Sequence, residues 1–128
     1  MPIQKQNPLG TFGRGRKHKF NAKSSHCAQG HFHASTGESR RCDTLHLYQK
    51  AKEIKGLEIH PTIELVTGMK YKPDFLYFEG KKRIYEDFKG VSTDRFRIIC
   101  KLWPHHGTGT LRISGDKKAN RDIAGVRV

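Results

Sequence analysis

The most constraining feature of the sequence is a stretch of aromatic and β-branched residues, 71–90, interrupted once by a short polar turn. Such residues favour a pleated, half-buried surface, and the Glu-Gly-Lys-Lys segment at 79–82 is typical of a hairpin connection. The sequence therefore predicts two antiparallel strands joined at Gly80 and Lys81.

The length of the turn determines which side chains lie opposite one another. With Gly80 and Lys81 as the loop, or with a four-residue loop, Asp74 comes opposite Asp87. A three-residue loop would shift the register by one residue and move the side chains to other faces. Two carboxylates at directly opposed positions lie about 5 Å apart at Cβ and repel, and Lys89 projects from the same face as Asp87. The sequence predicts a patch of these three charged groups, and the simpler alternative is a surface hairpin with solvated charges.

Length and charge limit the classes of protein to consider. A chain of 128 residues with a formal net charge of +13 has room for one domain with a modest core. The cationic excess indicates a polyanionic partner, nucleic acid first, with a ribosomal-type or membrane-surface basic protein as the alternative. No apolar run approaches the roughly 18 residues of a membrane span. The 3 cysteines are scattered rather than arranged as a disulfide framework, so we expect a cytoplasmic location.

Basic segments flank the central part of the chain. Residues 1–20 contain several cations and no acid, which predicts a disordered basic arm that follows a phosphate backbone or only aids solubility. Residues 115–128 are expected to form a loose basic tail, which leaves 21–114 as the single folded domain. The cations expected to contact nucleic acid are Arg14, Arg16, Lys17, Lys19, Arg40, Arg41, Arg97 and Lys101.

Cysteine and histidine residues gather before and within the first expected helix. Cys27 and His31 share the same spacing as Cys42 and His46, and an i, i+4 pair on a helix can chelate one metal ion. Zinc takes four such ligands, but this spacing is not a common zinc-finger spacing. The alternative is a loop with a short strand in which Phe32 is buried. The sequence leaves a structural zinc site open.

A helix is expected over residues 36–55, ended by Gly56. Ser35 and Glu38 have the form of a capping box at its start. Glu38 either caps the helix or faces the hairpin as a third carboxylate. The expected buried stripe consists of Leu47, Ala51 and Ile54, with Tyr48 beside it.

The remaining elements define the fold class. A strand over residues 57–67, kinked at Pro61, is expected to pair with the hairpin. A helix over residues 94–103, stopped by Pro104, then leads to a strand over residues 110–114. This order places the last strand parallel to the hairpin through a right-handed crossover. The prediction is an α/β (α+β) fold, a small mixed sheet with flanking helices.

Clustered carboxylates beside a lysine suit hydrolysis of phosphodiester bonds. Two or three carboxylates about 4–6 Å apart bind Mg²⁺ through oxygen and leave water on the ion. Water bound in this way can attack phosphorus. A nearby lysine orients that water or neutralises the phosphate.

The same residues carry a resemblance to known nucleases. Pro73-Asp74 followed by Asp87-Phe88-Lys89 resembles the PD-(D/E)xK motif. The match continues in other segments, so that residues 21–114 resemble a family of small phage-encoded endonucleases described as Holliday-junction-resolvase-like. These segments are Gly30-His31-Phe32, Ser35-x-x-Glu38-x-x-Arg41, Tyr71-x-x-Asp74-Phe75 and Glu86-Asp87-Phe88-Lys89-Gly90.

The resemblance implies a restriction-endonuclease-like core and a specific site. Glu38, Asp74 and Asp87 would ligate Mg²⁺ or Mn²⁺, and Lys89 would serve the attacking water. His60 stands where relatives often carry Gln, which leaves its role open. The implied enzyme cuts DNA, including branched DNA, acts as a symmetric dimer and works in an infected bacterial host. The alternatives are a non-catalytic nucleic-acid-binding protein and a zinc-stabilised binding module.

Overall fold

The computed structural model describes residues 24–89, 93–115 and 121–126. The basic arm predicted over residues 1–20 lies outside the described residues. The elements are β1 (Ser25–His26), β2 (Phe32–His33), α1 (Thr36–Lys50), β3 (Lys55–Ile59), β4 (Ile63–Val66), β5 (Met69–Tyr71), β6 (Phe75–Glu79), β7 (Lys82–Phe88), α2 (Asp94–His106), β8 (Thr110–Ser114) and β9 (Arg121–Ala124).

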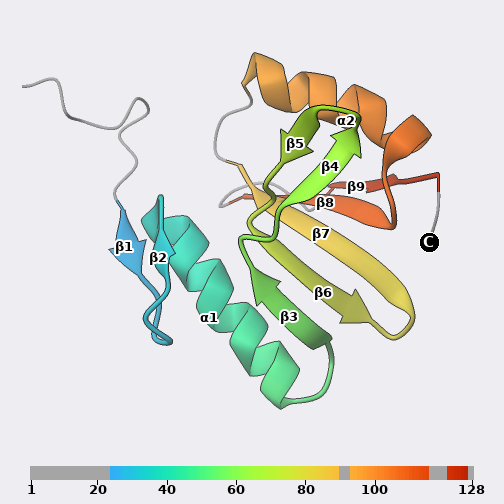
Figure 1. Cartoon of the computed structure of the whole chain (residues 1–128). Helices are drawn as coiled ribbons and strands as arrows, with labels where there is room; N and C mark the ends of the chain where they lie inside the picture. The colour runs from blue at the N-terminus through green and yellow to red at the C-terminus, as the bar shows by residue number, and fades with distance from the viewer. Residues whose placement is uncertain (1–23, 90–92, 116–120, 127–128) are drawn as a thin grey trace, which may run out of the picture.

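A 5-stranded mixed sheet with the order β3-β6-β7-β8-β9 forms the centre of the fold. Strands β3, β6 and β7 form an antiparallel meander, β8 runs parallel to β7, and β9 closes the edge antiparallel to β8. Helix α1 covers one face of the sheet, while α2 and the β4–β5 hairpin cover the other (Figure 1). The predicted mixed fold, with its order of helix, strand, hairpin, helix and strand, is confirmed.

The register of the β6–β7 hairpin is the one that the short turn predicts. Glu79 pairs with Lys82, which leaves Gly80 and Lys81 as the loop. Gly80 has a φ of 62°, a left-handed conformation that glycine adopts without steric cost. The ladder continues to the pair of Phe75 and Glu86, so the next step outward brings Asp74 and Asp87 together.

Helix α1 differs from its prediction in length and in its buried side. It ends at Lys50 because Lys52 adopts a φ of 66° and the Glu53 N–H donates to the Tyr48 carbonyl, as in a Schellman motif. Leu47, expected inside, is 65% exposed, and Gly56 lies in β3 rather than at the helix end. The residues that α1 buries are Gly37, Glu38, Ser39, Cys42 and Leu45.

The strand expected over residues 57–67 is divided between two sheets. Strand β3 ends at Ile59, and Pro61 separates it from β4, which pairs with β5 instead of the hairpin. His60 occupies the break with a φ of 54°. Tyr71, expected in the first strand of the hairpin, belongs to β5 and turns its side chain into the core beneath α2.

Two further segments extend beyond their predicted roles. Helix α2 continues through Pro104 to His106, where the Gly107 N–H still donates to the Trp103 carbonyl. Residues 121–124, expected within a loose tail, form β9 because they pair with β8 along the sheet edge. Phe32, which the alternative to a zinc site would bury, is 57% exposed. Neither helix of the described residues is both long and apolar enough to cross a membrane.

Candidate active site

Asp74 and Asp87 lie at the end of the β6–β7 hairpin farthest from its turn. The Asp74 carboxylate accepts a hydrogen bond of 2.8 Å from the Phe88 N–H, and the Asp87 carboxylate accepts one from the Tyr71 hydroxyl. Burial, then the charges of Asp87 and Glu38, raise the pKa of Asp74 to about 9, although the Phe88 N–H opposes the shift. At neutral pH this carboxyl therefore keeps a proton unless a cation takes its place.

Lys89 lies beside this pair, on the side of the sheet that α2 covers. Its Nζ is 3.5 Å from Asp87 Oδ1 and 4.8 Å from the centre of the Phe96 ring. The Lys89 side chain is 31% exposed, whereas that of Asp87 is 3% exposed. The structure therefore brings Asp74, Asp87 and Lys89 together as the register predicts, with the Lys89 side chain half-buried.

Glu38 belongs to the first turn of α1, which Ser35 caps by accepting a 3.1 Å hydrogen bond from the Glu38 N–H. The Glu38 carboxylate itself is buried and contacts two histidines instead of capping the helix. Its Oε2 lies 2.5 Å from His33 Nδ1 and 3.0 Å from His60 Nε2. A carboxylate oxygen accepts hydrogen bonds, so each contact requires a proton on the ring nitrogen that faces Glu38.

His60 connects Glu38 to the aspartate pair. Its ring meets Glu38, while its backbone N–H donates a 2.8 Å hydrogen bond to the Asp74 carbonyl. A non-glycine residue with a φ of 54° is costly by roughly 1–3 kcal/mol and persists where surrounding contacts hold it. The contacts to Glu38 and Asp74 hold His60 in this conformation. They give His60 a structural role, which the sequence had left open.

Metal-ligating side chains form two tight groups among the described residues. Within each group all ligand atoms lie within 4.8 Å of one another, and Glu38, Asp74 and Asp87 do not form a third such group. Glu38 therefore acts on Asp74 through its charge, while its carboxylate is held by histidines. The two groups are His33, Glu38 and His60, and Cys27, His31, His33 and Cys42.

Glu86, next to Asp87 in β7, points to the opposite side of the sheet and is fully buried. Arg41 donates to it twice, at 2.6 and 2.9 Å, and the Tyr77 and Ser114 hydroxyls donate at 2.5 and 2.7 Å. Burial lowers the pKa of Arg41, but the hydrogen bonds and charge of Glu86 raise it by more, so the net shift of this pKa is upward. The anion that Arg41 binds is therefore Glu86, inside the protein, and not nucleic acid as predicted. The sequence pattern did not indicate this role of Glu86.

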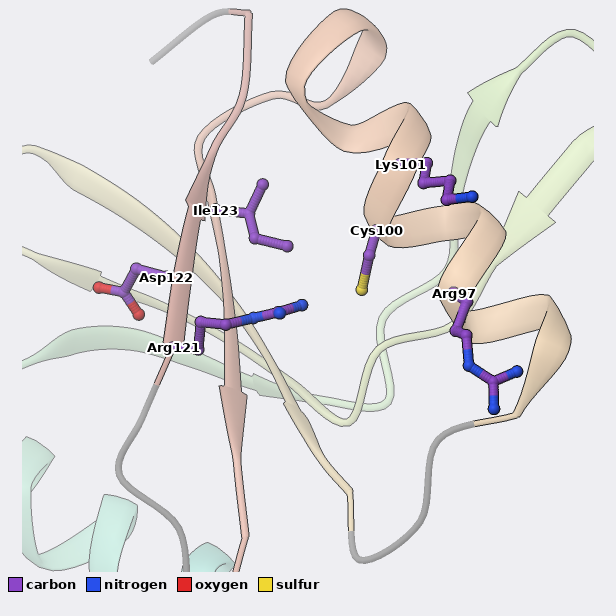
Figure 2. Close-up of a pocket in the computed structure, with 6 residues that line it drawn as sticks. All are labelled: Arg97, Cys100, Lys101, Arg121, Asp122 and Ile123. Carbon is purple, nitrogen blue, oxygen red and sulfur yellow. The ribbon is translucent and has the colours of Figure 1, made fainter.

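A basic pocket of ≈ 610 Å³ lies between α2 and β9 (Figure 2). Arg97 and Lys101, both predicted to contact nucleic acid, line it from α2, and Arg121 reaches toward them from β9. Burial raises the pKa of Cys100 in the pocket wall, Arg121 opposes the shift, and Asp87 and Lys89 also influence it. The same helix meets Lys89 through Phe96, so the pocket and the site of Lys89 share α2.

The other predicted DNA-contacting cations divide into two sets. Arg40 is exposed on α1. The four cations in the amino-terminal arm lie outside the described residues. These are Arg14, Arg16, Lys17 and Lys19.

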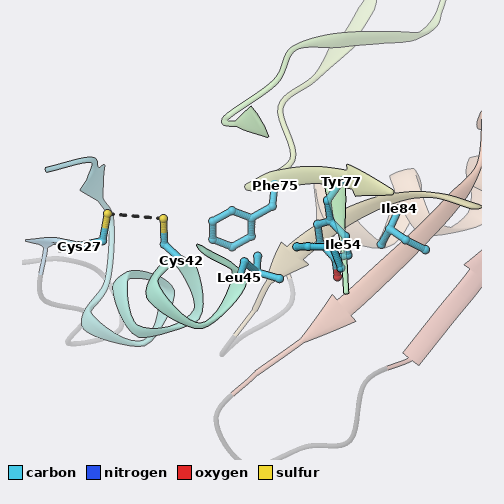
Figure 3. Packing of buried hydrophobic residues seen from close by; sticks show 7 residues of the cluster. All are labelled: Cys27, Cys42, Leu45, Ile54, Phe75, Tyr77 and Ile84. Atoms are coloured by element: carbon cyan, nitrogen blue, oxygen red, sulfur yellow. Dashed lines mark hydrogen bonds between the residues drawn. The ribbon is translucent and has the colours of Figure 1, made fainter. Parts of the chain in front are cut away.

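A Cys/His group that could hold a metal ion lies between the β1–β2 hairpin and α1. Cys27 Sγ and Cys42 Sγ face each other at 3.5 Å (Figure 3). His31 Nδ1 lies 3.3 Å from the first sulfur and 3.7 Å from the second. His46, predicted as the fourth ligand, is near Cys42, but His33 completes the group instead.

Comparison with known proteins gives a family without a described activity. No curated protein matches the chain, and no solved structure matches it. Residues 17–114 match the family described as "Protein of unknown function (DUF1064)". This match covers most of the chain, including α1, the aspartate pair, Lys89 and α2. The chain belongs to the DUF1064 family.

Proposed function

We propose that the chain is a metal-dependent DNA endonuclease that hydrolyses phosphodiester bonds. The observation that carries the proposal is the aspartate pair beside a lysine, with Lys89 Nζ 3.5 Å from Asp87 Oδ1. The resemblance of this pattern to the PD-(D/E)xK motif, on strands with the expected pairing, supports the same reading.

The chemistry of the pair fits Mg²⁺ or Mn²⁺. Asp74 and Asp87 offer oxygen ligands, which these ions prefer. The pKa of about 9 for Asp74 shows how strongly burial and the neighbouring carboxylates disfavour its ionised form without a cation. When bound, a divalent ion supplies a Lewis acid and an activated water for attack on phosphorus.

The surrounding side chains orient the reacting groups. The Tyr71 hydroxyl and the Phe88 N–H each donate to one aspartate and so fix the direction of its remaining lone pairs. Lys89, with its half-buried side chain beside Asp87, is suited to hold the attacking water or to neutralise the phosphate. Glu38 adds negative charge beside Asp74, which strengthens the attraction for a cation.

The charge distribution favours DNA as the substrate. The net charge is +13, and the pocket between α2 and β9 places Arg97, Lys101 and Arg121 next to the site. The resemblance to Holliday-junction-resolvase-like enzymes adds branched DNA and a symmetric dimer of a phage-encoded protein to the proposal.

The direct test is cleavage of supercoiled plasmid, linear duplex and four-way-junction DNA by the full chain. We expect cleavage with Mg²⁺ or Mn²⁺ and none with EDTA. Faster cleavage of the junction than of the duplex would support branched DNA as the substrate. DNA binding without cleavage of any substrate by either ion would instead identify a non-catalytic nucleic-acid-binding protein.

A further inference from the structure

We propose that Cys27, His31, His33 and Cys42 bind one structural Zn²⁺, and that His33 links this ion to Glu38. The site is separate from the aspartate pair, and its occupancy does not depend on whether the chain cleaves DNA. Its ligands come from the β1–β2 hairpin and its turn and from one turn of α1.

The distances among three of the four ligand atoms, those of Cys27, His31 and Cys42, match those around a tetrahedral zinc ion. Zinc–sulfur bonds of about 2.3 Å and zinc–nitrogen bonds of about 2.0 Å imply sulfur–sulfur separations near 3.8 Å and sulfur–nitrogen separations near 3.5 Å. The two cysteine sulfurs are 3.5 Å apart, and His31 Nδ1 is 3.3 Å and 3.7 Å from them. A disulfide would require sulfurs at about 2.0 Å, and Cys27 and Cys42 are free.

His33 supplies the independent sign of a missing ligand. It is fully buried, and its Nε2 is the one buried side-chain nitrogen or oxygen of the described residues that has no hydrogen-bond partner. Such orphans are rare, because burying an unpaired polar atom costs about 1–3 kcal/mol. A ring nitrogen of His33 lies within 4.8 Å of the ligand atoms of the other three residues.

The other side of the His33 ring has the partner expected of a zinc ligand. Histidines that bind zinc usually donate their second N–H to a carboxylate or carbonyl. His33 Nδ1 makes this contact to Glu38 Oε2 at 2.5 Å, which leaves Nε2 for the metal. Through His33 the ion would therefore hold the Glu38 carboxylate in place. The same carboxylate contacts His60, and its charge raises the pKa of Asp74.

His46 lies outside the group of ligand atoms, and its own contacts give it another role. Its Nδ1 lies 2.8 Å from the Cys42 carbonyl and thus serves the helix backbone. Its ring stacks on that of His31 with centroids 5.4 Å apart and so supports a ligand instead of acting as one. The set therefore differs from the sequence-based hypothesis in one position, His33 in place of His46.

The first experiment measures metal content in reduced protein after gel filtration. We expect one zinc per chain in the wild type and in His46→Gln, and a loss of at least about tenfold in affinity in His33→Gln. His26→Gln, which changes an exposed histidine nearby, is the matched surface control. The ligand set is overturned if His46→Gln loses zinc while His33→Gln keeps it. Absence of zinc from both the purified and the zinc-reconstituted wild type overturns the whole proposal.

The second experiment replaces zinc with Co²⁺ and records its absorption spectrum. Two thiolates predict strong thiolate-to-cobalt charge-transfer bands, and tetrahedral geometry predicts intense visible d–d bands. Cys27→Ser should weaken the charge-transfer bands, and circular dichroism of the same sample distinguishes this from unfolding. If Cys27→Ser does not fold, His33→Gln provides the same test through the loss of d–d intensity. An octahedral spectrum in the wild type contradicts the site.

Glu38→Gln tests the link between the two sites without any cleavage assay. Removing the carboxylate that orients a zinc-binding histidine should raise the zinc dissociation constant about 10- to 100-fold. Competition with a chromophoric chelator measures this change. Glu53→Gln, on an exposed residue beyond the end of α1, is the control and should leave the constant unchanged. An unchanged constant in Glu38→Gln contradicts the link.

Discussion

Asp87 raises the pKa of Asp74 because the hairpin register holds the two carboxylates side by side at the buried end of β6 and β7. Burial is the larger cause, and Glu38 adds to the shift from α1. The three acids thus belong to one electrostatic unit, although only the two aspartates share the hairpin. A metal ion would relieve the repulsion between these carboxylates. Without a metal ion, a proton on Asp74 relieves it.

The raised pKa predicts an unusual dependence of stability on pH. The folded chain holds a proton on Asp74 up to about pH 9, whereas the unfolded chain loses it near the ordinary value of 3.8. Between these values the folded state binds more protons, so this group's contribution to stability falls as the pH rises. Asp74→Asn removes the effect and should stabilise the metal-free protein by an amount that grows with pH, at most about 1.4 kcal/mol per unit.

Urea unfolding of the metal-free protein at several pH values from about 5 to about 9 measures this difference. Glu58→Gln, at an exposed position of β3, is the control and should show little dependence on pH. Added Mg²⁺ should reverse the order, because it stabilises the form that binds it. A gain from Asp74→Asn that is constant across the pH range contradicts the assigned pKa.

Glu86 should matter more for stability than a surface glutamate with a similar partner. Glu86→Ala leaves Arg41 without its carboxylate and two buried hydroxyls without their acceptor, a loss of about 3–5 kcal/mol. Glu79→Ala removes an arginine contact at the rim, where Arg112 keeps Asp122, and should cost about 1 kcal/mol or less. Chemical denaturation of both variants measures the contrast, and equal losses would contradict a buried polar centre at Glu86.

The basic pocket predicts how binding depends on salt. Lys101→Ala and Arg121→Ala should each weaken DNA binding and lower the slope of log affinity against log salt by about 1. Lys55→Ala, on an exposed residue of β3, should leave the slope unchanged. Fluorescence anisotropy with a labelled duplex across a salt series measures all three. A slope that responds equally to Lys55→Ala would mean that binding depends only on the overall charge.

Local signals were enough to predict the hairpin but not the end of α1. The turn at Gly80 and the alternation of strand side chains predicted the register that brings Asp74 and Asp87 together, and the pairing of Glu79 with Lys82 excludes the alternative of a three-residue loop. Helix α1 ends at a left-handed lysine, Lys52, so the usual glycine signal pointed instead to Gly56. The sequence pattern also placed Leu47 on the buried side of the helix, whereas the structure exposes it.

Contacts between distant segments explain what sequence reasoning missed. His60 meets Glu38 across 22 residues of chain, and Arg41 meets Glu86 across 45. Neither spacing carries a periodic signal, because the contacts arise only when α1 packs on the sheet. The Cys/His cluster was recognised from spacing, yet the choice of His33 over His46 required the orphan nitrogen of the folded chain.

The proposed nuclease site consists of Asp74, Asp87 and Lys89. Single-turnover cleavage of plasmid DNA with Mg²⁺, compared between matched variants, measures the part that each residue plays. Asp87→Asn and Lys89→Ala should each slow cleavage by at least about 10²-fold. Glu58→Gln and Lys81→Ala, exposed residues away from the pair, should retain the wild-type rate. Cleavage at the wild-type rate by Asp87→Asn or Lys89→Ala would mean that these residues do not form a nuclease site.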